Sequence, residues 1–124
     1  MADDINELID EYGRRCTAHD AAAVAELCHS PFLALRGGVS SHLSDPAAVR
    51  AHYQQMMDAF RAAGAATWLP VAVDCHPLGD HAAFATVHWH ALDADLNVVL
   101  DTFATYHLLL QEEGWRFLSY TTHS

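Results

Sequence analysis

The spacing of apolar residues changes near residue 65, from a helical period to a strand period. Before that point they mostly recur at three- and four-residue intervals, which is typical of the buried face of a helix. After it they alternate along the chain, which is typical of strands with two distinct faces. Helices followed by strands on short turns predict an α+β domain, in which the helices cover one face of a strongly curved, mostly antiparallel sheet.

Three helices are expected. The first carries an apolar stripe of Ile5, Leu8, Ile9, Tyr12 and Cys16. Asp20 is expected to cap a second, shorter helix, which carries Val24, Leu27 and Cys28 and ends at Ser30-Pro31. Ser44 or Asp45 is expected to cap the third, with Pro46 in its first turn and Gly64 at its end. The buried stripe of this third helix is predicted to be Val49, Tyr53, Met56, Met57 and Phe60.

Two short strands are predicted at 32–35 and 39–43, joined by a Gly37-Gly38 turn. Four longer ones are predicted at 67–76, 81–92, 98–111 and 115–123. Pro70 lies inside the first of the long strands, so we expect that strand to bend or to lie at a sheet edge.

Each strand offers one face to the helices. The more apolar faces are predicted to point inward: Ala83, Ala85, Val87 and Trp89, then Leu100, Thr102, Ala104, Tyr106, Leu108 and Leu110, then Trp115, Phe117, Ser119, Thr121 and His123. The other face keeps four large apolar residues, namely Phe84, Phe103, Leu109 and Leu118. Exposed apolar patches usually mark a partner surface, so we expect a homodimer through the outer sheet face.

The charge balance excludes two classes of partner. The 124 residues, which fit a single domain over 1–124, include six arginines, no lysine and sixteen acids, for a net charge of −10. Binding to nucleic acid or to an anionic membrane surface needs a basic footprint, and we expect neither.

The chain is expected to be cytoplasmic. Acids stand near the N-terminus where a signal peptide carries positive charge, and no apolar run approaches the length of a membrane span. Cys16, Cys28 and Cys75 have no CxxC spacing and are expected to be free thiols. Twenty-two alanines and no lysine favour a bacterial source with a GC-rich genome.

Several motifs in fixed order resemble one family. They are Ile5-x-x-Leu8-Ile9-x-x-Tyr12, His19-Asp20, Asp45-Pro46-Ala-Ala-Val49-Arg50-x-x-Tyr53, Leu78-Gly79-Asp80-x-Ala82, Tyr106-His107-Leu108 and Gly114-Trp115-Arg116-Phe117. Over residues 5–123 the sequence resembles the nuclear transport factor 2-like superfamily, which includes ketosteroid isomerases and SnoaL-like polyketide cyclases. The resemblance implies a cone-shaped barrel with an internal pocket between the sheet and the third helix.

Few catalytic residues of the ketosteroid isomerases have a counterpart in this sequence. Tyr12 matches the tyrosine that serves ketosteroid isomerases as an oxyanion donor. Their general-base aspartate falls at Leu35 or Arg36, and their second cavity aspartate falls near Ala104. Proton abstraction next to a carbonyl needs a base, so steroid isomerisation is not expected.

Three polar groups remain as candidate catalytic residues: Tyr12, Tyr106 and His123. The two phenols could hold a carbonyl or hydroxyl group, or could be core aromatics with satisfied hydroxyls. His123, beside Ser119 and Thr121 on the face predicted to point inward, could act as an acid or base, or could be a frayed terminal residue. The ligand-binding set is predicted to be Arg36, Tyr53, Met56, Phe60, Trp89, Phe117, Ser119 and Thr121. An inward Arg36 would favour an anionic ligand, whereas an outward one would be a solvated charge.

His88 and His90 share one strand face at a spacing that can bind a metal, with Asp101 or His107 as a third ligand. We expect this pair on the outer face and predict no metal or other cofactor. The leading hypothesis is a protein that binds a small apolar organic molecule, as a SnoaL-like isomerase, cyclase or dehydratase. The alternatives are a non-catalytic binding or dimerisation module of the same fold and, more weakly, a metal site on His88 and His90.

Overall fold

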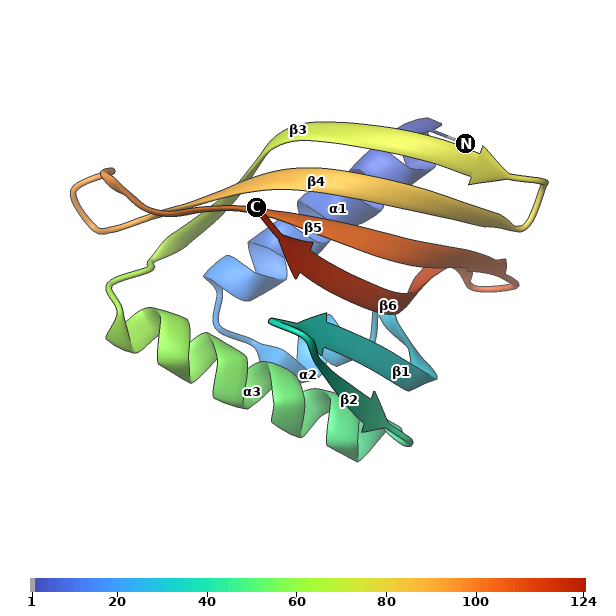
Figure 1. Ribbon diagram of the computed structural model, residues 1–124, viewed down its shortest axis with the longest axis horizontal. Helices are drawn as coiled ribbons and strands as arrows, with labels where there is room; N and C mark the ends of the chain where they lie inside the picture. The colour runs from blue at the N-terminus through green and yellow to red at the C-terminus, as the bar shows by residue number, and fades with distance from the viewer. Residues whose placement is uncertain (1) are drawn as a thin grey trace.

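Three helices form within residues 2–124, the part of the chain that the computed structural model describes (Figure 1). They are α1 (Ala2–Thr17), α2 (Ala21–Ala25) and α3 (Pro46–Ala62). Asp20 caps α2, because its carboxylate accepts a 3.1 Å hydrogen bond from the Ala23 N–H. Asp45 caps α3 in the same way through the Ala48 N–H at 2.8 Å, with Pro46 at the first helical position. None of the helices within residues 2–124 combines the length and the apolar character of a membrane span.

The second helix is shorter than predicted. It ends at Ala25, and Leu27 and Cys28 lie outside it. Cys28 begins β1, and the Leu27 carbonyl accepts a 2.9 Å hydrogen bond from the Phe117 N–H. The prediction that this helix carries Leu27 and Cys28 and ends at Ser30-Pro31 was therefore wrong, since Ser30 and Pro31 lie within β1.

Six strands form one mixed sheet, in the order β2-β1-β6-β5-β4-β3. The strands are β1 (Cys28–Arg36), β2 (Val39–Leu43), β3 (Thr67–Leu78), β4 (Ala82–Leu92), β5 (Val98–Gln111) and β6 (Gly114–His123). Only β1 and β6 pair in parallel, which confirms the α+β fold with a mostly antiparallel sheet. The expected barrel is not closed, because β2 and β3 are free edges at opposite ends of the strand order.

The edge position of β3 explains its proline. Pro70 has no N–H to donate, and the pairing of β3 with β4 shifts register between Pro70 and Ala72. The predicted edge position of this strand is confirmed.

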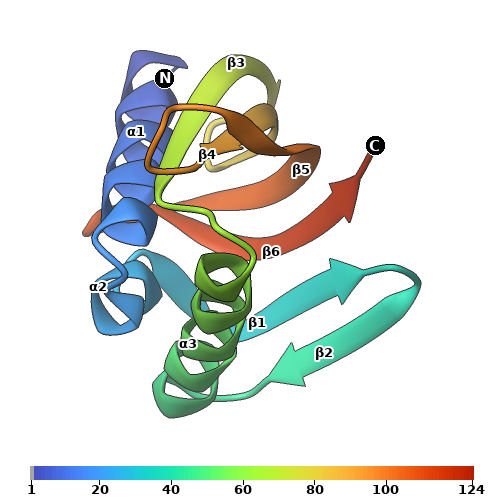
Figure 2. The same ribbon diagram turned by 90° about the vertical axis from the view of Figure 1, so that its left-hand side faces the viewer.

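The helices cover one face of the sheet, with α1 beside β3 and α3 beside β1 and β2 (Figure 2). The predicted apolar stripe of α1 is buried, as is the predicted inward face of β4. Gly13 allows the close approach of α1 to the sheet, because a Cβ there would lie 3.2 Å from Cζ3 of Trp89. The core is one apolar cluster of helix and strand side chains.

The face of β6 changes along its length. Trp115 and Phe117 point inward as predicted, but the next buried residue is Tyr120. The pairing of β5 with β6 shifts register between His107 and Leu108, so one extra residue enters β6 after Phe117. Because side chains alternate, this bulge reverses the face of every later residue in the strand.

Candidate functional site

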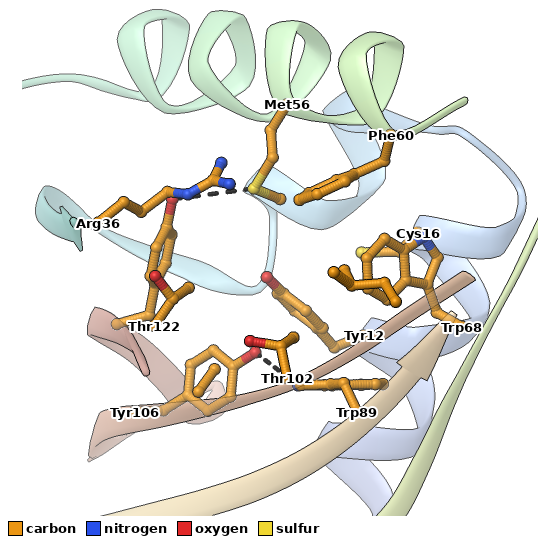
Figure 3. Close-up of a pocket in the computed structure, with 13 residues that line it drawn as sticks. Tyr12, Cys16, Arg36, Met56, Phe60, Trp68, Trp89, Thr102, Tyr106 and Thr122 are labelled. Carbon is orange, nitrogen blue, oxygen red and sulfur yellow. Dashed lines mark hydrogen bonds between the residues drawn. The ribbon is translucent and has the colours of Figure 1, made fainter. Parts of the chain in front are cut away.

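A pocket lies between α3 and the helix-covered face of the sheet (Figure 3). Met56 and Phe60 reach into it from α3, and Trp89 and Tyr106 face them from the sheet. Its other lining residues are Tyr12, Cys16, Arg36, Trp68, Leu100, Thr102, Ala104, Tyr120 and Thr122. No carboxylate lines this pocket, so the described residues offer no acid of the ketosteroid isomerase kind within it.

The pocket is small, at about 60 Å³. One water molecule needs roughly 10–15 Å³ in the same measure, so the space encloses on the order of five non-hydrogen atoms. Phe60, Trp68 and Trp89 pack against one another in the pocket wall, with ring centroids 5.1 Å apart for Phe60 and Trp68 and 6.4 Å apart for the two indoles. A large polycyclic ligand would therefore need these side chains to move.

Two phenols of the pocket, those of Tyr12 and Tyr106, are hydrogen-bond donors and not bases. Tyr106 and Tyr12 are almost fully buried, and burial raises the pKa of each hydroxyl above its ordinary value. The Trp89 indole N–H donates to the Tyr106 hydroxyl at 3.0 Å, which leaves the proton of Tyr106 available to a ligand. The Tyr12 hydroxyl donates to the Tyr53 hydroxyl at 3.1 Å.

Arg36 is the one cation among the lining residues, and it lies at the exposed end of β1. Its guanidinium carbon sits 5.2 Å from the centre of the Phe60 ring, a cation–π contact. Within residues 2–124 this guanidinium forms no ion pair. The residue is thus both solvent-exposed and part of the pocket wall.

His52 forms a second polar feature at the pocket. Its Nε2 atom lies 2.6 Å from the hydroxyl of Tyr120, which lines the pocket. Burial lowers the pKa of His52, and the charge of Arg36 lowers it further, so the imidazole is neutral at pH 7. Burial raises the pKa of Tyr120 to about 12, against the opposing effect of Arg36.

The thiols offer no activated nucleophile. Cys16 lines the pocket, but burial raises its pKa to about 12, so it stays protonated at neutral pH. All three cysteines are free, as predicted.

Six of the predicted site residues meet in the pocket: Tyr12, Arg36, Met56, Phe60, Trp89 and Tyr106. Tyr53 and Phe117 lie directly behind it as fully buried supports. The Phe117 ring is centred 4.8 Å from that of Tyr12 and 4.9 Å from that of Tyr106. These two hold the pocket tyrosines in place.

Three predicted site residues point the other way. Ser119, Thr121 and His123 follow the bulge in β6 and pair with the outward-facing residues His107, Thr105 and Phe103. His123 bonds to the Thr105 hydroxyl at 2.8 Å and is exposed. The prediction that these three face the pocket was wrong, because the bulge replaces them with Tyr120 and Thr122.

His52, Trp68, Tyr120 and Thr122 lie at the site but were not predicted from the sequence. The bulge had one visible signal: after Trp115 and Phe117 the next large residue is Tyr120, three positions on instead of two. His52 had none, because its partner lies 68 residues away.

His88 and His90 lie on the outer face, as predicted. Asp101 on β5 stands directly opposite His90, whereas His107 pairs with Phe84 and packs against its ring at 4.8 Å. Of the two third ligands considered, Asp101 is therefore the one within reach.

The sequence and the fold are both similar to those of known proteins. The family described as NTF2-like protein (DUF6841) matches residues 3–124. No curated protein matches the sequence significantly. An NTF-2 like protein of unknown function from Shewanella oneidensis MR-1 superposes with a TM-score of 0.79 at 13% identity, covering 99% of this chain and 98% of that one.

Two further structures share the fold. An NTF2-like protein with a cystatin-like fold from Novosphingobium aromaticivorans has a TM-score of 0.77 at 21% identity, covering 98% of this chain and 79% of that one. A candidate dehydratase of the NTF2-like family from Streptomyces avermitilis has a TM-score of 0.74 at 15% identity, covering 97% and 92%. At such identities the likeness shows the fold alone. The family match over nearly the whole chain shows more, and the protein belongs to the NTF2-like family.

Proposed function

We propose that this protein binds a small organic anion in the pocket, with the apolar body of the ligand enclosed and its carboxylate at Arg36. The observation that carries the proposal is the placement of the Arg36 guanidinium, which forms no ion pair within residues 2–124, at the mouth of a largely apolar pocket. In a chain of net charge −10, a cation at such a mouth is the group that would attract an anion.

The walls suit a short ligand. Met56, Phe60 and Trp89 supply apolar contact, and the free proton of the Tyr106 hydroxyl supplies one hydrogen bond to a ligand oxygen. The volume of about 60 Å³ favours a body of a few carbon atoms. A branched short-chain acid such as isobutyrate has this size and charge.

A titration with isobutyrate tests this binding. Trp68 and Trp89 line the pocket, so their fluorescence should change in a saturable way. Ala104→Leu fills the cavity and should abolish the change, whereas Ala72→Leu, exposed on β3, should leave it intact. A titration without saturation, or equal binding by both variants, would refute the proposal.

A second candidate function is proton-transfer catalysis, and the contact between His52 and Tyr120 favours it. The Tyr120 oxygen can take a proton from the carbon next to a ligand carbonyl while its own proton passes to the neutral His52. The enolate oxygen that forms would be stabilised by the Tyr106 hydroxyl.

Exchange of the carbon-bound protons of α-ketobutyrate in heavy water tests the catalytic candidate. The wild-type protein should accelerate the exchange, and Tyr120→Phe and His52→Gln should each remove the acceleration. Gln55→Ala, exposed on α3, is the matched control and should behave as wild type. If the wild type exchanges these protons no faster than buffer, the pocket binds without catalysing this step.

We also propose that two copies associate through the outer sheet face. Of the four apolar residues predicted to be exposed on this face, Phe84 is 40% exposed, whereas Phe103, Leu109 and Leu118 are half-buried. Leu69, the cross-strand neighbour of His90, is also exposed there, at 44%. Apolar exposure on one face of an open sheet supports a two-fold dimer.

A further inference from the structure

We propose that His88, His90 and Asp101 form a binding site for a divalent transition-metal ion such as Zn²⁺ on the outer face of the sheet. These three residues bring their ligand atoms within 4.8 Å of one another. The site is separate from the pocket and does not depend on ligand binding there. It shares the outer sheet face with the proposed dimer interface, since Leu69 is the cross-strand neighbour of His90.

The strand geometry places all three side chains on one face. His88 and His90 are two residues apart on β4, so both point outward, while Trp89 between them points into the pocket. Asp101 on β5 is the cross-strand partner of His90 and shares that outward face. The set therefore joins two neighbouring strands and needs no movement of the backbone to assemble.

The distances fit a single ion. The Asp101 Oδ1 atom lies 2.5 Å from the Nε2 atom of His88 and 3.5 Å from that of His90. Ligand atoms that share a tetrahedral ion at about 2.0–2.1 Å lie roughly 3.3 Å apart, between these two values. The hydrogen bond between His88 and Asp101 would lengthen as the ion replaces the proton that the two atoms share.

The surroundings order the ligands before an ion arrives. The His88 ring stacks on Phe103 at 4.4 Å with an interplanar angle of 13°. The His88 and His90 side chains keep only 26% and 27% of their exposure. The Asp101 Oδ1 atom already lies in hydrogen-bond contact with Nε2 of His88, so the carboxylate is directed toward the histidine pair.

The donor set selects the kind of metal. Two imidazoles with one carboxylate favour Zn²⁺ and its first-row neighbours over Mg²⁺ and Ca²⁺, which prefer oxygen ligands. Three protein ligands leave at least one coordination position open, and here it faces outward. The site can thus hold an exchangeable water or a donor from another molecule.

Calorimetric titration of the tag-free protein with Zn²⁺ tests the site. We expect one ion per chain, with affinity reduced at least about tenfold in both Asp101→Asn and His90→Gln, since even the loss of an outer-shell partner costs about 10- to 100-fold. His107→Gln, a histidine on the same face outside the set, should bind as wild type.

Substitution with Co²⁺ gives a second readout that needs no variant. Ligation by nitrogen and oxygen should produce visible bands without the sulfur-to-cobalt charge-transfer band that any of the three free cysteines would cause. Absence of a stoichiometric site, a sulfur band, or equal affinity in Asp101→Asn and wild type would each overturn the proposal.

Discussion

The Nε2 atom of His52 on α3 lies 2.6 Å from the Tyr120 hydroxyl on β6, across 68 residues of sequence. The contact joins the long helix to the central part of the sheet at the pocket wall. It also places an imidazole whose pKa is lowered beside a phenol whose pKa is raised, and each shift has burial as its first cause.

The lowered pKa of His52 predicts a pH-dependent contribution to stability. The folded state favours the neutral imidazole, whereas the unfolded chain takes up a proton near the ordinary value of about 6.5. As the pH falls from about 7 to 5, the free energy of unfolding should therefore decrease more for the wild type than for His52→Asn. Urea denaturation of both proteins across this range measures it. The free energy of unfolding of the wild type minus that of His52→Asn should therefore fall toward low pH. If it stays constant or rises, the burial of a neutral histidine is contradicted.

The hydrogen bond from Trp89 to Tyr106 predicts that replacing the Trp89 indole lowers the free energy of unfolding more than replacing the Trp115 indole does. Trp89→Phe leaves the fully buried Tyr106 hydroxyl without its donor, which costs about 1–3 kcal/mol beyond the loss of ring volume. Trp115→Phe is the matched control, since that indole is equally buried and forms no side-chain hydrogen bond among residues 2–124. Equal loss of unfolding free energy in the two variants would show that the bond has no net value.

The start of α3 predicts which of two neighbouring residues is its cap. Asp45→Ala should reduce the free energy of unfolding by about 1 kcal/mol, because the Ala48 N–H loses its acceptor. Ser44→Ala, one residue earlier and exposed, should change it by less than about 0.5 kcal/mol. Thermal or urea denaturation decides between them, and a larger effect at Ser44 would contradict the capping geometry.

The proposed dimer through the outer sheet face predicts the mass of the protein in solution. Sedimentation should give twice the chain mass of 13.6 kDa, and Phe84→Asp should reduce it to one chain, since a carboxylate would be buried in the interface. Leu96→Asp, 72% exposed in the β4–β5 turn, is the control and should remain dimeric. A wild-type mass of one chain would refute the dimer.

Much of the fold could be predicted from local sequence. Asp20 and Asp45 cap helices as expected, and the alternation in β4 gave its buried face without error. Both signals lie within a few residues of where they act, and the side chains involved are strongly apolar or strongly capping.

Prediction of the site was less complete, because part of it depends on long-range pairing. The bulge after Phe117 is set by the register of β6 against β5, and it moved Ser119, Thr121 and His123 out of the pocket. Tyr120 lines the pocket instead, and His52 on α3 contacts its hydroxyl. A prediction that assumes strict two-residue alternation along a strand cannot locate a shift in strand register.

Arg36 is the residue proposed to bind the carboxylate of an anionic ligand, and a comparison of isobutyrate with isobutyramide isolates that role. The two ligands differ mainly in charge. Arg36→Met should weaken isobutyrate binding about tenfold, equivalent to ~1.4 kcal/mol, and change isobutyramide binding little. Arg50→Met, exposed on α3, should alter neither. Loss of both ligands to the same extent, or of neither, in Arg36→Met would contradict the proposed function.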